Sequence, residues 1–344
     1  MGEGKRMVRF GIVGCGTIAA FHAAAIAQLE NARLLGVWDA LPEAARRFAG
    51  ERGVRAYETM EAMLEDAEID AVCICTPSGF HGAQAIDAVR HGKHVALEKP
   101  MCLELSQADE LARLAGQNGC QVCVISQLRF SPAMRALKDA VEKKAFGRVV
   151  SGSLSMKYYR SDEYYASSSW RGTWRMDGGG ALMNQGIHGV DLLQYLMGGV
   201  RAVTAIAKTQ TRRIETEDSV VAVLEFANGA LGTLEASTTC FPGYPRRLEI
   251  CGDKGSAVLS EDTVERWDLS IPLQLETGTA VGGAASDPKA ISCEGHRRQL
   301  ENLVGAIEGR EALMVDAAEG RKPLEIILAV YQSAREGRRV ALIP

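Results

Sequence analysis

The segment around Gly14 constrains the fold more than any other part of the sequence. The apolar run MVRFGIVG ends in a glycine, the alanine-rich stretch 17–30 is typical of a helix, and ARLLGVWD is again typical of a strand. Small residues, Gly14, Gly16 and Ala19, fall where the first strand turns into the helix. This order of elements predicts a βαβ unit, the building block of a parallel sheet.

The same alternation continues to residue 126. Further strands are predicted for IDAVCICT, HVALEK and CQVCVIS, and helices for residues 42–52, 79–91 and 106–117, with Ser106 as an expected N-cap. Continuous apolar strands separated by helices indicate a parallel sheet that is buried on both faces. Residues 1–126 are therefore predicted to form a doubly wound α/β domain of the Rossmann type.

The pattern changes after Phe130. One more helix is expected at 131–144, followed by alternating runs such as VVSGSLSMKYY, VRAVTAIAKTQ and DSVVAVLEF. Asn228 and Gly229 separate two such runs, which is a strong hairpin signal, and a second hairpin is expected at 253–255. Residues 127–344 are thus predicted to form an α+β domain with a large, mainly antiparallel sheet.

Helices and loops are also expected in this second domain. The helices are predicted near 180–197, 295–307 and 316–336, and the Ser/Gly-rich stretches 161–180 and 277–293 are predicted to be loops.

The composition excludes several classes of protein. With 344 residues the chain is long enough for two domains, and its net charge of -4 argues against a nucleic-acid partner. No apolar run reaches the length of a membrane span, and the N-terminal residues do not resemble a signal peptide. Most of the nine cysteines lie in apolar runs, which favours free thiols and a cytoplasmic location. The pair Cys120 and Cys123 lacks a second pair of ligands, so no metal site is expected.

The glycine turn has the spacing of a dinucleotide-binding site. Gly14 permits the tight turn, Gly16 lets the backbone approach a pyrophosphate, and the helix that starts at Thr17 and Ile18 offers its N–H groups to the phosphates. Asp39 closes the next strand 20 residues after Ala19 and is placed to bind the ribose hydroxyls. The cofactor is predicted to be NAD rather than NADP, because a 2′-phosphate would meet this carboxylate. A glycine turn of purely structural purpose is the less favoured interpretation.

Lys99 lies in the sequence Glu98-Lys99-Pro100, directly after the strand HVALEK. Ligands of open parallel sheets bind at the carboxyl ends of the strands. A lysine at this edge could hold a substrate hydroxyl and help to remove its proton as hydride leaves. The alternative is an ordinary surface lysine at the end of a strand.

A second polar group lies within GGGALMNQGIHGVDLLQYLMGG. The spacing of Asn184, His188 and Asp191 places them on one face of a predicted helix, and Tyr195 continues the same stripe. His188 could act as an acid or base near neutral pH. A structural histidine is the alternative interpretation.

Taken together, these segments resemble the Gfo/Idh/MocA oxidoreductases. The resemblance covers GIVGCGTIA, TPSGFHGAQAIDAVRHGKHVALEKP, RFSP and GGGALMNQGIHGVDLL, in that order. It implies a Rossmann domain followed by a domain whose open sheet often forms dimers or tetramers. It also implies NAD-linked chemistry on sugars, sugar acids, sugar nucleotides or cyclitols.

The resemblance also implies roles for individual residues. Lys99 is expected to be catalytic, with His188 beside it at the reacting carbon. Members that act on inositols carry an aspartate where this chain has Asn184, and an asparagine cannot take a proton. The remaining residues implied at the cofactor are Thr76, Pro77, His81, Glu98 and Gln127.

Several further residues precede the glycines of the second polar group. Trp174, Arg171 and Arg175 are predicted to bind the substrate, together with Asp191 and Tyr158. The arginines suggest an acidic group such as a uronate or a phosphorylated or nucleotide sugar. They could equally contact the cofactor or stabilise the loop.

Roles remain open for the other histidines. His296 either reaches the cleft or packs between domains, and His22, His91 and His94 are expected to be structural.

The sequence therefore predicts an NAD-dependent dehydrogenase that acts on a CH–OH group of a carbohydrate-like small molecule. It is expected to be a homodimer or homotetramer, with no nucleic-acid or membrane partner. Two alternatives stay open: an enzyme that cleaves glycosides through transient oxidation, and an NAD-sensing protein without catalysis. The presence of Lys99 and His188 argues against the second.

Overall fold

The computed structural model describes residues 7–275 and 292–342. The chain divides into two compact units. The N-terminal unit contains Met1–Gln127 and Cys293–Arg321, and the C-terminal unit contains Leu128–Ser292 and Lys322–Pro344. The first boundary lies one residue from the predicted one, but 293–321 belongs with the N-terminal unit. Buried apolar side chains of this segment, Leu300, Leu303 and Val304, pack in the N-terminal core, which explains the assignment. Most of the loop expected at 277–293 lies outside the described residues.

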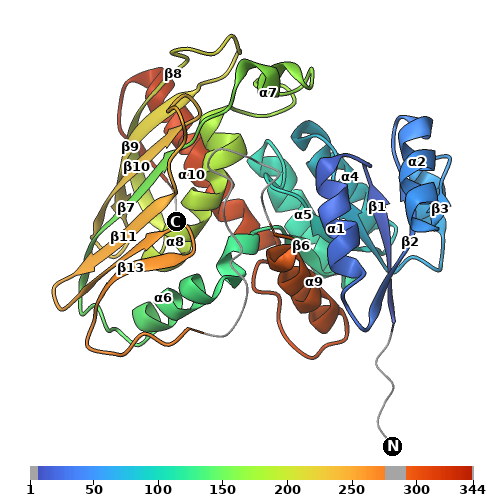
Figure 1. The fold of residues 1–344 in the computed structure, drawn as a ribbon, viewed down its shortest axis with the longest axis horizontal. Helices are drawn as coiled ribbons and strands as arrows, with labels where there is room; N and C mark the ends of the chain where they lie inside the picture. The colour runs from blue at the N-terminus through green and yellow to red at the C-terminus, as the bar shows by residue number, and fades with distance from the viewer. Residues whose placement is uncertain (1–6, 276–291, 343–344) are drawn as a thin grey trace, which may run out of the picture. The chain divides into compact units, whose positions relative to one another are not determined.

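The N-terminal unit contains a six-stranded parallel sheet with the strand order β3-β2-β1-β4-β5-β6 (Figure 1). The strands are β1 (Val8–Val13), β2 (Ala32–Trp38), β3 (Arg55–Ala56), β4 (Ala71–Ile74), β5 (His94–Leu97) and β6 (Val122–Val124). The helices are α1 (Thr17–Ile26), α2 (Pro42–Arg52), α3 (Met60–Glu65), α4 (Ser78–Arg90), α5 (Leu105–Asn118) and α9 (Glu294–Ile307). The doubly wound order that the sequence predicts is confirmed.

Local sequence explains some of the helix ends in this unit. Helix α2 has proline in its first turn and ends at Gly53, which adopts the left-handed conformation with φ 65°. Helix α5 differs from the prediction, because its N-cap residue is Glu104 and no side chain caps it. Ser106 is therefore inside the first turn rather than at the cap. The helix is instead held by its apolar face, where Ala108, Leu111 and Ala115 are buried.

The C-terminal unit contains an eight-stranded sheet with the order β13-β12-β11-β7-β10-β9-β8-β14. Its strands are β7 (Val149–Lys157), β8 (Val200–Lys208), β9 (Ser219–Phe226), β10 (Leu231–Ser237), β11 (Arg247–Gly252), β12 (Ser256–Ser260), β13 (Thr263–Asp268) and β14 (Val340–Ala341). Among the strands that the structure describes, only β7 and β10 pair in parallel, so the mainly antiparallel sheet is confirmed. Both predicted hairpins, β9–β10 and β11–β12, are present.

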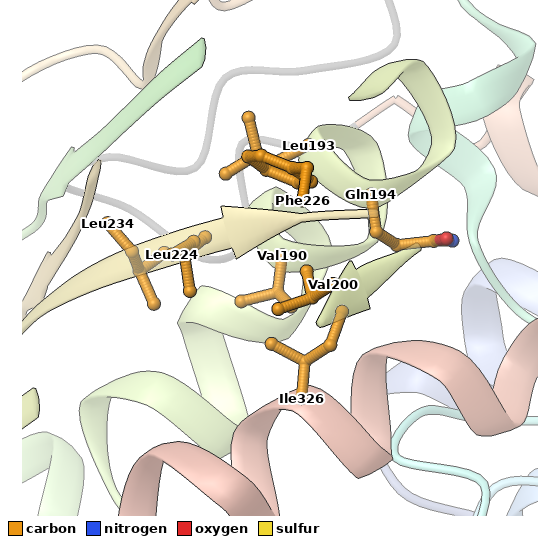
Figure 2. Close-up of a pocket in the computed structure, with 8 residues that line it drawn as sticks. All are labelled: Val190, Leu193, Gln194, Val200, Leu224, Phe226, Leu234 and Ile326. Carbon is orange, nitrogen blue, oxygen red and sulfur yellow. The ribbon is translucent and has the colours of Figure 1, made fainter. Parts of the chain in front are cut away.

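The described part of this unit also contains helices, some of which pack against the sheet. They are α6 (Pro132–Glu142), the short α7 (Asp162–Ala166), α8 (Ile187–Met197) and α10 (Ala317–Glu336), whose first residues belong to the N-terminal unit. Figure 2 shows a small gap where α8 and α10 meet the sheet, lined by Val190, Leu193, Gln194, Val200, Leu224, Phe226, Leu234 and Ile326. The gap is too narrow for a water molecule, so it is part of the core and not a binding site. Among the described residues, no helix combines the length and apolar character needed to cross a membrane.

The helix expected at 180–197 has two parts. Residues Ala181–Gly186 form a π-helical turn, and the α-helix α8 starts only at Ile187. The extra residue per turn rotates Asn184 away from the position that a continuous α-helix would give it. Asn184 and His188 are half-buried, whereas Asp191 is buried in the core, so the three do not form one uniform polar face.

Candidate active site

The glycine turn after β1 has the geometry of a dinucleotide site. Gly14 has φ +90°, and a Cβ there would lie 2.9 Å from Thr76 Cγ2, so only glycine fits. A Cβ on Gly16 would meet no atom within 4 Å. No side chain caps the helix α1, which leaves the N–H groups of its first turn, at Thr17 and Ile18, directed toward this space. The space and the donors suit a pyrophosphate.

Asp39 is fixed beside this turn at the end of β2. Its Oδ2 accepts a hydrogen bond of 2.7 Å from the Cys15 backbone N–H, and its Oδ1 accepts one of 2.8 Å from Leu41. A carboxylate can accept about four hydrogen bonds, so capacity remains for the two ribose hydroxyls. The residues present therefore fit NAD, and the role of Asp39 at the adenosine ribose stays a prediction.

The loops after β4 and β5 are tied together by His81. Its Nδ1 lies 2.7 Å from the Pro100 carbonyl oxygen, and its Nε2 lies 2.8 Å from the Thr76 carbonyl oxygen. Burial lowers the pKa of His81. Thr76 also donates its hydroxyl to Gln84 at 2.6 Å, and Pro77 forms the N-cap of α4. These residues thus shape the edge of the sheet at which a nicotinamide would lie.

Lys99 follows β5 at the same edge and is half-buried. Its backbone N–H donates to Glu98 Oε2 at 3.2 Å. Glu98 is itself buried and contacts two histidines, His22 and His296, which the sequence did not indicate as a group. Gln127 opens a short helical turn after β6 and is buried, and its role at the cofactor stays a prediction.

In the C-terminal unit, a chain of side chains holds Asn184. Asn184 donates from Nδ2 to Asp177 Oδ1 at 2.6 Å and accepts from Gln185 Nε2 at 2.8 Å. Gln185 in turn accepts from Arg160 at 2.9 Å. Asp177 is 2% exposed, so its partnership with Asn184 lies in a region where an unpaired carboxylate would be costly. The amide of Asn184 is therefore fixed in one orientation.

A buried glutamate supports the glycines that precede Asn184. Glu217 accepts hydrogen bonds from the backbone N–H groups of Gly180 and Leu182, at 2.9 and 2.8 Å, and from the Tyr331 hydroxyl at 2.9 Å. Burial raises the pKa of Glu217 to about 7. A Cβ on Gly180 would overlap the Glu217 carbonyl oxygen, which explains the glycine at that position. The glutamate lies 37 positions from Gly180, so local spacing could not reveal it.

The structure gives Asp191 a partner other than a substrate. Arg129 donates to it from Nε at 2.8 Å and from Nη2 at 2.6 Å, and both side chains are buried. The guanidinium also lies 4.4 Å from the centre of the Tyr195 ring. Asp191 is 2% exposed and both its oxygens accept from Arg129, which indicates a structural ion pair, and its contact with substrate stays a prediction.

Tyr158 and Arg171, which are also predicted to bind the substrate, contact other residues of the chain. Tyr158 is 4% exposed and donates its hydroxyl to Glu261 at 3.3 Å. Arg171 donates to the hydroxyls of Ser167 and Ser168 at 2.6 and 3.1 Å, and it stacks on the Tyr164 ring. These contacts favour the loop-stabilising alternative for Arg171 and a core position for Tyr158, and their contact with substrate stays a prediction.

Trp174 and Arg175 remain accessible. The Trp174 indole N–H donates to the Glu215 carbonyl oxygen at 3.1 Å, and its ring meets that of Tyr331 edge to face, yet 44% of the residue is exposed. Arg175 is exposed next to it. These two side chains are available to a ligand from solvent.

The fold and the cofactor site define a class: an NAD-binding oxidoreductase built from a Rossmann domain and a second domain with an open sheet. Comparison with known proteins specifies the family. A model described as "Oxidoreductase family, NAD-binding Rossmann fold" matches residues 8–126, and one described as "GFO/IDH/MocA C-terminal domain" matches residues 134–258. The chain belongs to the Gfo/Idh/MocA family, and it is an NAD-dependent dehydrogenase.

Individual relatives resemble the chain over nearly its whole length. The WlbA dehydrogenase of Bordetella pertussis, solved with NADH and UDP-GlcNAcA, is 33% identical, with a TM-score of 0.88 over 98% of this chain and 100% of that one. The WlbA dehydrogenase of Chromobacterium violaceum, solved with the same two ligands, is 34% identical, with a TM-score of 0.88 over 98% and 96%. The inositol 2-dehydrogenase of Rhizobium meliloti is 27% identical over 97% of this chain and 99% of its own.

Proposed function

We propose that the chain oxidises a secondary hydroxyl carbon of a nucleotide-linked sugar acid of the UDP-GlcNAcA type. The observation that carries the proposal is the identity of 33 and 34% to two dehydrogenases whose structures contain UDP-GlcNAcA, against 27% for an inositol dehydrogenase. Asn184 adds support, because the sequence departs there from the inositol-type pattern. An acidic nucleotide sugar also agrees with the exposed Arg175.

We infer that Lys99 and His188 are the catalytic residues. NAD supplies the hydride acceptor when it is bound. Lys99 holds the substrate hydroxyl and takes its proton, and His188 hydrogen-bonds the same oxygen or relays that proton. Asn184, held by Asp177, cannot take a proton but can orient a neighbouring hydroxyl. Lys99 belongs to the N-terminal unit and His188 to the C-terminal unit, so their meeting at one carbon is part of the proposal.

We assign recognition of the acidic group to Arg175. Guanidinium groups bind carboxylates and phosphates through paired hydrogen bonds, and Arg175 is exposed, whereas Arg171 is engaged with serines. Trp174 lies next to it and offers an aromatic face on which the C–H side of a sugar ring can pack.

A substrate panel tests this assignment. UDP-GlcNAcA, UDP-GlcNAc, free glucuronate and myo-inositol are offered with NAD, and NADH absorbance is followed. UDP-GlcNAcA should be the preferred substrate, with kcat/KM for UDP-GlcNAc lower by more than about tenfold, since each lost charge-assisted contact is worth roughly 1.5–3 kcal/mol. NADH should accumulate in excess over enzyme. Products without accumulated NADH would point to the transient-oxidation alternative, and turnover of myo-inositol alone would contradict the proposal.

Arginine variants separate the carboxylate contact from general charge effects. Arg175→Ala should reduce the preference for UDP-GlcNAcA over UDP-GlcNAc. Arg266→Ala serves as the control, because Arg266 is an exposed arginine on β13 that pairs with Asp268. A preference unchanged in Arg175→Ala would remove Arg175 from the recognition site.

We further propose that the exposed face of the eight-stranded sheet joins two copies of the chain. Four large apolar side chains are exposed on neighbouring strands there: Ile206 65%, Val221 57%, Val223 51% and Leu231 58%. Ile206 and Val221 are paired in register. A contiguous apolar patch of this kind is typical of an interface. Light scattering should give a dimer or a tetramer, and Val221→Asp should shift the mass toward the monomer; an unchanged mass would contradict this interface.

The thiols support a reducing compartment. All nine cysteines are free, and six of them are buried. Because free thiols persist where glutathione and thioredoxin keep them reduced, we propose that the enzyme works in the cytoplasm.

A further inference from the structure

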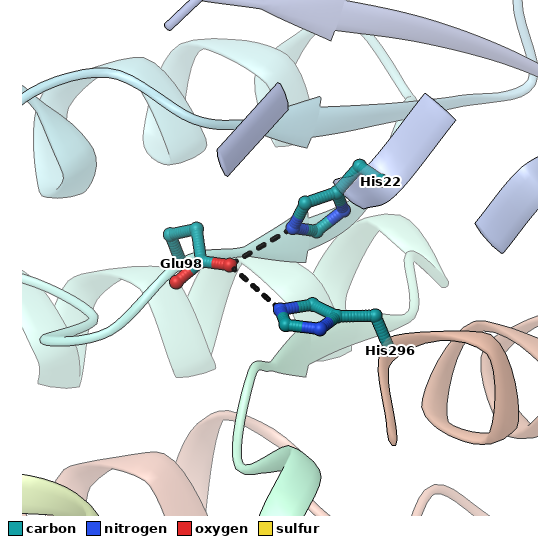
Figure 3. A group of neighbouring side chains, drawn as sticks. All are labelled: His22, Glu98 and His296. Carbon is teal, nitrogen blue, oxygen red and sulfur yellow. Dashed lines mark hydrogen bonds and ion pairs between the residues drawn. The ribbon is translucent and has the colours of Figure 1, made fainter. Parts of the chain in front are cut away.

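The carboxylate of Glu98 lies between two imidazole rings in the N-terminal unit (Figure 3). Nε2 of His22, from α1, is 2.9 Å from Glu98 Oε1, and Nε2 of His296, from α9, is 3.4 Å from the same oxygen. Glu98 is 5% exposed, His22 0% and His296 1%. Three elements far apart in the sequence thus converge on one buried charge.

The protonation state of this group follows from its contacts. An ionised carboxylate only accepts hydrogen bonds, so each ring donates from Nε2, and a neutral ring then carries no proton on Nδ1. Burial lowers the pKa of His22, which keeps that ring neutral. Burial alone would raise the pKa of Glu98, but the hydrogen bonds from His22 and His296 outweigh it and hold the pKa well below its ordinary value. The group is therefore a buried anion that contacts two histidine rings, of which His22 is neutral.

The other oxygen of Glu98 connects this anion to the candidate catalytic residue. Glu98 Oε2 accepts from the backbone N–H of Lys99 at 3.2 Å. On the far side of Lys99, the Pro100 carbonyl oxygen lies 2.7 Å from His81 Nδ1. The backbone around Lys99 is thus held at two points, by Glu98 at the Lys99 N–H and by His81 at the Pro100 carbonyl oxygen. The buried carboxylate provides the first of these contacts.

We propose that His22 and His296 are positioning residues for the reaction. By orienting the ionised Glu98, they fix the backbone from which Lys99 reaches the substrate. This inference rests on the proposed catalytic role of Lys99. Losing either donor leaves a buried carboxylate short of a partner, and Glu98 then turns or draws in water, which displaces Lys99.

The contacts favour hydrogen bonds over a metal ion. Nε2 of both rings lies close to the same Glu98 oxygen, at 2.9 Å for His22 and 3.4 Å for His296, and 2.9 Å is the distance of a hydrogen bond. The three side chains offer three ligand atoms within 4.8 Å, and within residues 7–275 and 292–342 no fourth His, Cys, Asp or Glu belongs to the group. A structural zinc site has four protein ligands, and the second ring nitrogen of each ligating histidine normally has a hydrogen-bond acceptor. Both Nδ1 atoms here have no hydrogen-bond partner among the described residues.

Paired substitutions test the positioning role. His22→Leu and His296→Leu remove each donor, whereas His22→Gln and His296→Gln keep an N–H at nearly the position of Nε2. The leucine variants should lose kcat by about tenfold to hundredfold, as expected for a small misplacement of a reacting group, with the Kd for NAD within about twofold of wild type. The glutamine variants should recover most of the loss. His91→Leu is the control, since His91 is an exposed histidine at the end of α4.

Lys99→Ala, measured alongside, separates this inference from the proposed function. If Lys99→Ala keeps its kcat, the proposed function is wrong at its catalytic residue. If Lys99→Ala is inactive while both leucine variants keep wild-type kcat, the positioning inference is overturned and the proposed function stands. Glutamine variants as inactive as the leucine variants, or one metal ion per chain by elemental analysis, would likewise overturn the inference.

Discussion

The candidate functional residues of the two units are held in different ways. In the N-terminal unit the groups offered to the cofactor are mostly backbone: a glycine turn, the uncapped start of α1 and one carboxylate fixed by backbone N–H groups. In the C-terminal unit the residues proposed for the substrate are side chains held by other side chains, as when Asp177 fixes Asn184. Backbone geometry depends on a few adjacent residues, whereas a side-chain network depends on partners that the fold brings together.

This difference explains how mutations should act in each half. A substitution of Gly16 in the glycine turn changes the shape offered to the cofactor without meeting any other part of the unit. A substitution in the C-terminal network breaks a pair, and the partner that remains is left buried without a counterpart. Substitutions in the glycine turn should therefore show losses of NAD binding, whereas substitutions in the C-terminal network should show losses of stability along with activity.

The largest effects on kcat are expected for the two proposed catalytic residues, Lys99 in the N-terminal unit and His188 in the C-terminal unit. Lys99→Ala and His188→Ala should each lower kcat by roughly 10²–10⁴-fold, the range for a group that transfers a proton in the transition state. The Kd for NAD, from fluorescence titration, should stay within about twofold of wild type. Either variant with near-wild-type turnover is not catalytic.

The next effect concerns the buried ion pair in the C-terminal unit. Asp191→Ala leaves the Arg129 guanidinium buried without its carboxylate, which should cost about 3–5 kcal/mol in the free energy of unfolding. Asp191→Asn, which keeps one acceptor oxygen, should cost less. Urea unfolding followed by circular dichroism measures both. A stable Asp191→Ala variant with a raised KM for substrate would instead support the substrate contact that the sequence predicted.

The glycine turn offers a smaller effect with a closely matched control. A Cβ at Gly16 or at Gly50 meets no atom within 4 Å, so neither Gly16→Ala nor Gly50→Ala should disturb the fold. Only Gly16 faces the space predicted for the pyrophosphate. Gly16→Ala should weaken NAD binding by more than about tenfold, or about 1.4 kcal/mol, with Gly50→Ala unchanged. Equal affinities would mean that the pyrophosphate does not approach Gly16.

The difference between local backbone geometry and long-range side-chain networks also determines what the sequence could predict. The fold of the N-terminal unit and the positions of Gly14, Gly16 and Asp39 followed from local spacing, because each contributes through its own backbone or its nearest neighbours. The position of Asp191 in the core did not, because its partner Arg129 lies 62 positions away. The polar stripe assumed a regular α-helix, and the π-helical turn Ala181–Gly186 broke that assumption.

Some missed features had no local signal at all. The group of His22, Glu98 and His296 joins residues separated by 76 and 198 positions, and each histidine alone resembles an ordinary core residue. Glu217 is similar, since a glutamate just before a predicted strand is normally exposed. The sequence indicates Glu98 only through its position directly before Lys99. Long-range pairs of buried polar residues therefore remain the part of such a site that only the folded structure reveals.

The smallest effect tests whether the C-terminal network carries the pH dependence that its burial implies. The pKa of Glu217 rises to about 7 on folding, because burial disfavours its charged form, so the folded chain binds this proton more tightly than the unfolded chain. The resulting stabilisation is complete below the ordinary glutamate pKa of about 4.3 and is lost as the pH rises through about 7. Between pH 6 and 8 the loss should be about 1 kcal/mol.

Glu217→Gln, which is neutral at every pH, should be less stable overall, because its amide group meets the N–H donors of Gly180 or Leu182. Its free energy of unfolding should nevertheless fall less between pH 6 and 8 than that of wild type. Glu215→Gln is the control, since Glu215 is exposed two positions away and should keep the wild-type slope. Should Glu217→Gln keep that slope as well, the pH dependence would arise elsewhere, and the support of the glycine segment by Glu217 would not depend on its protonation.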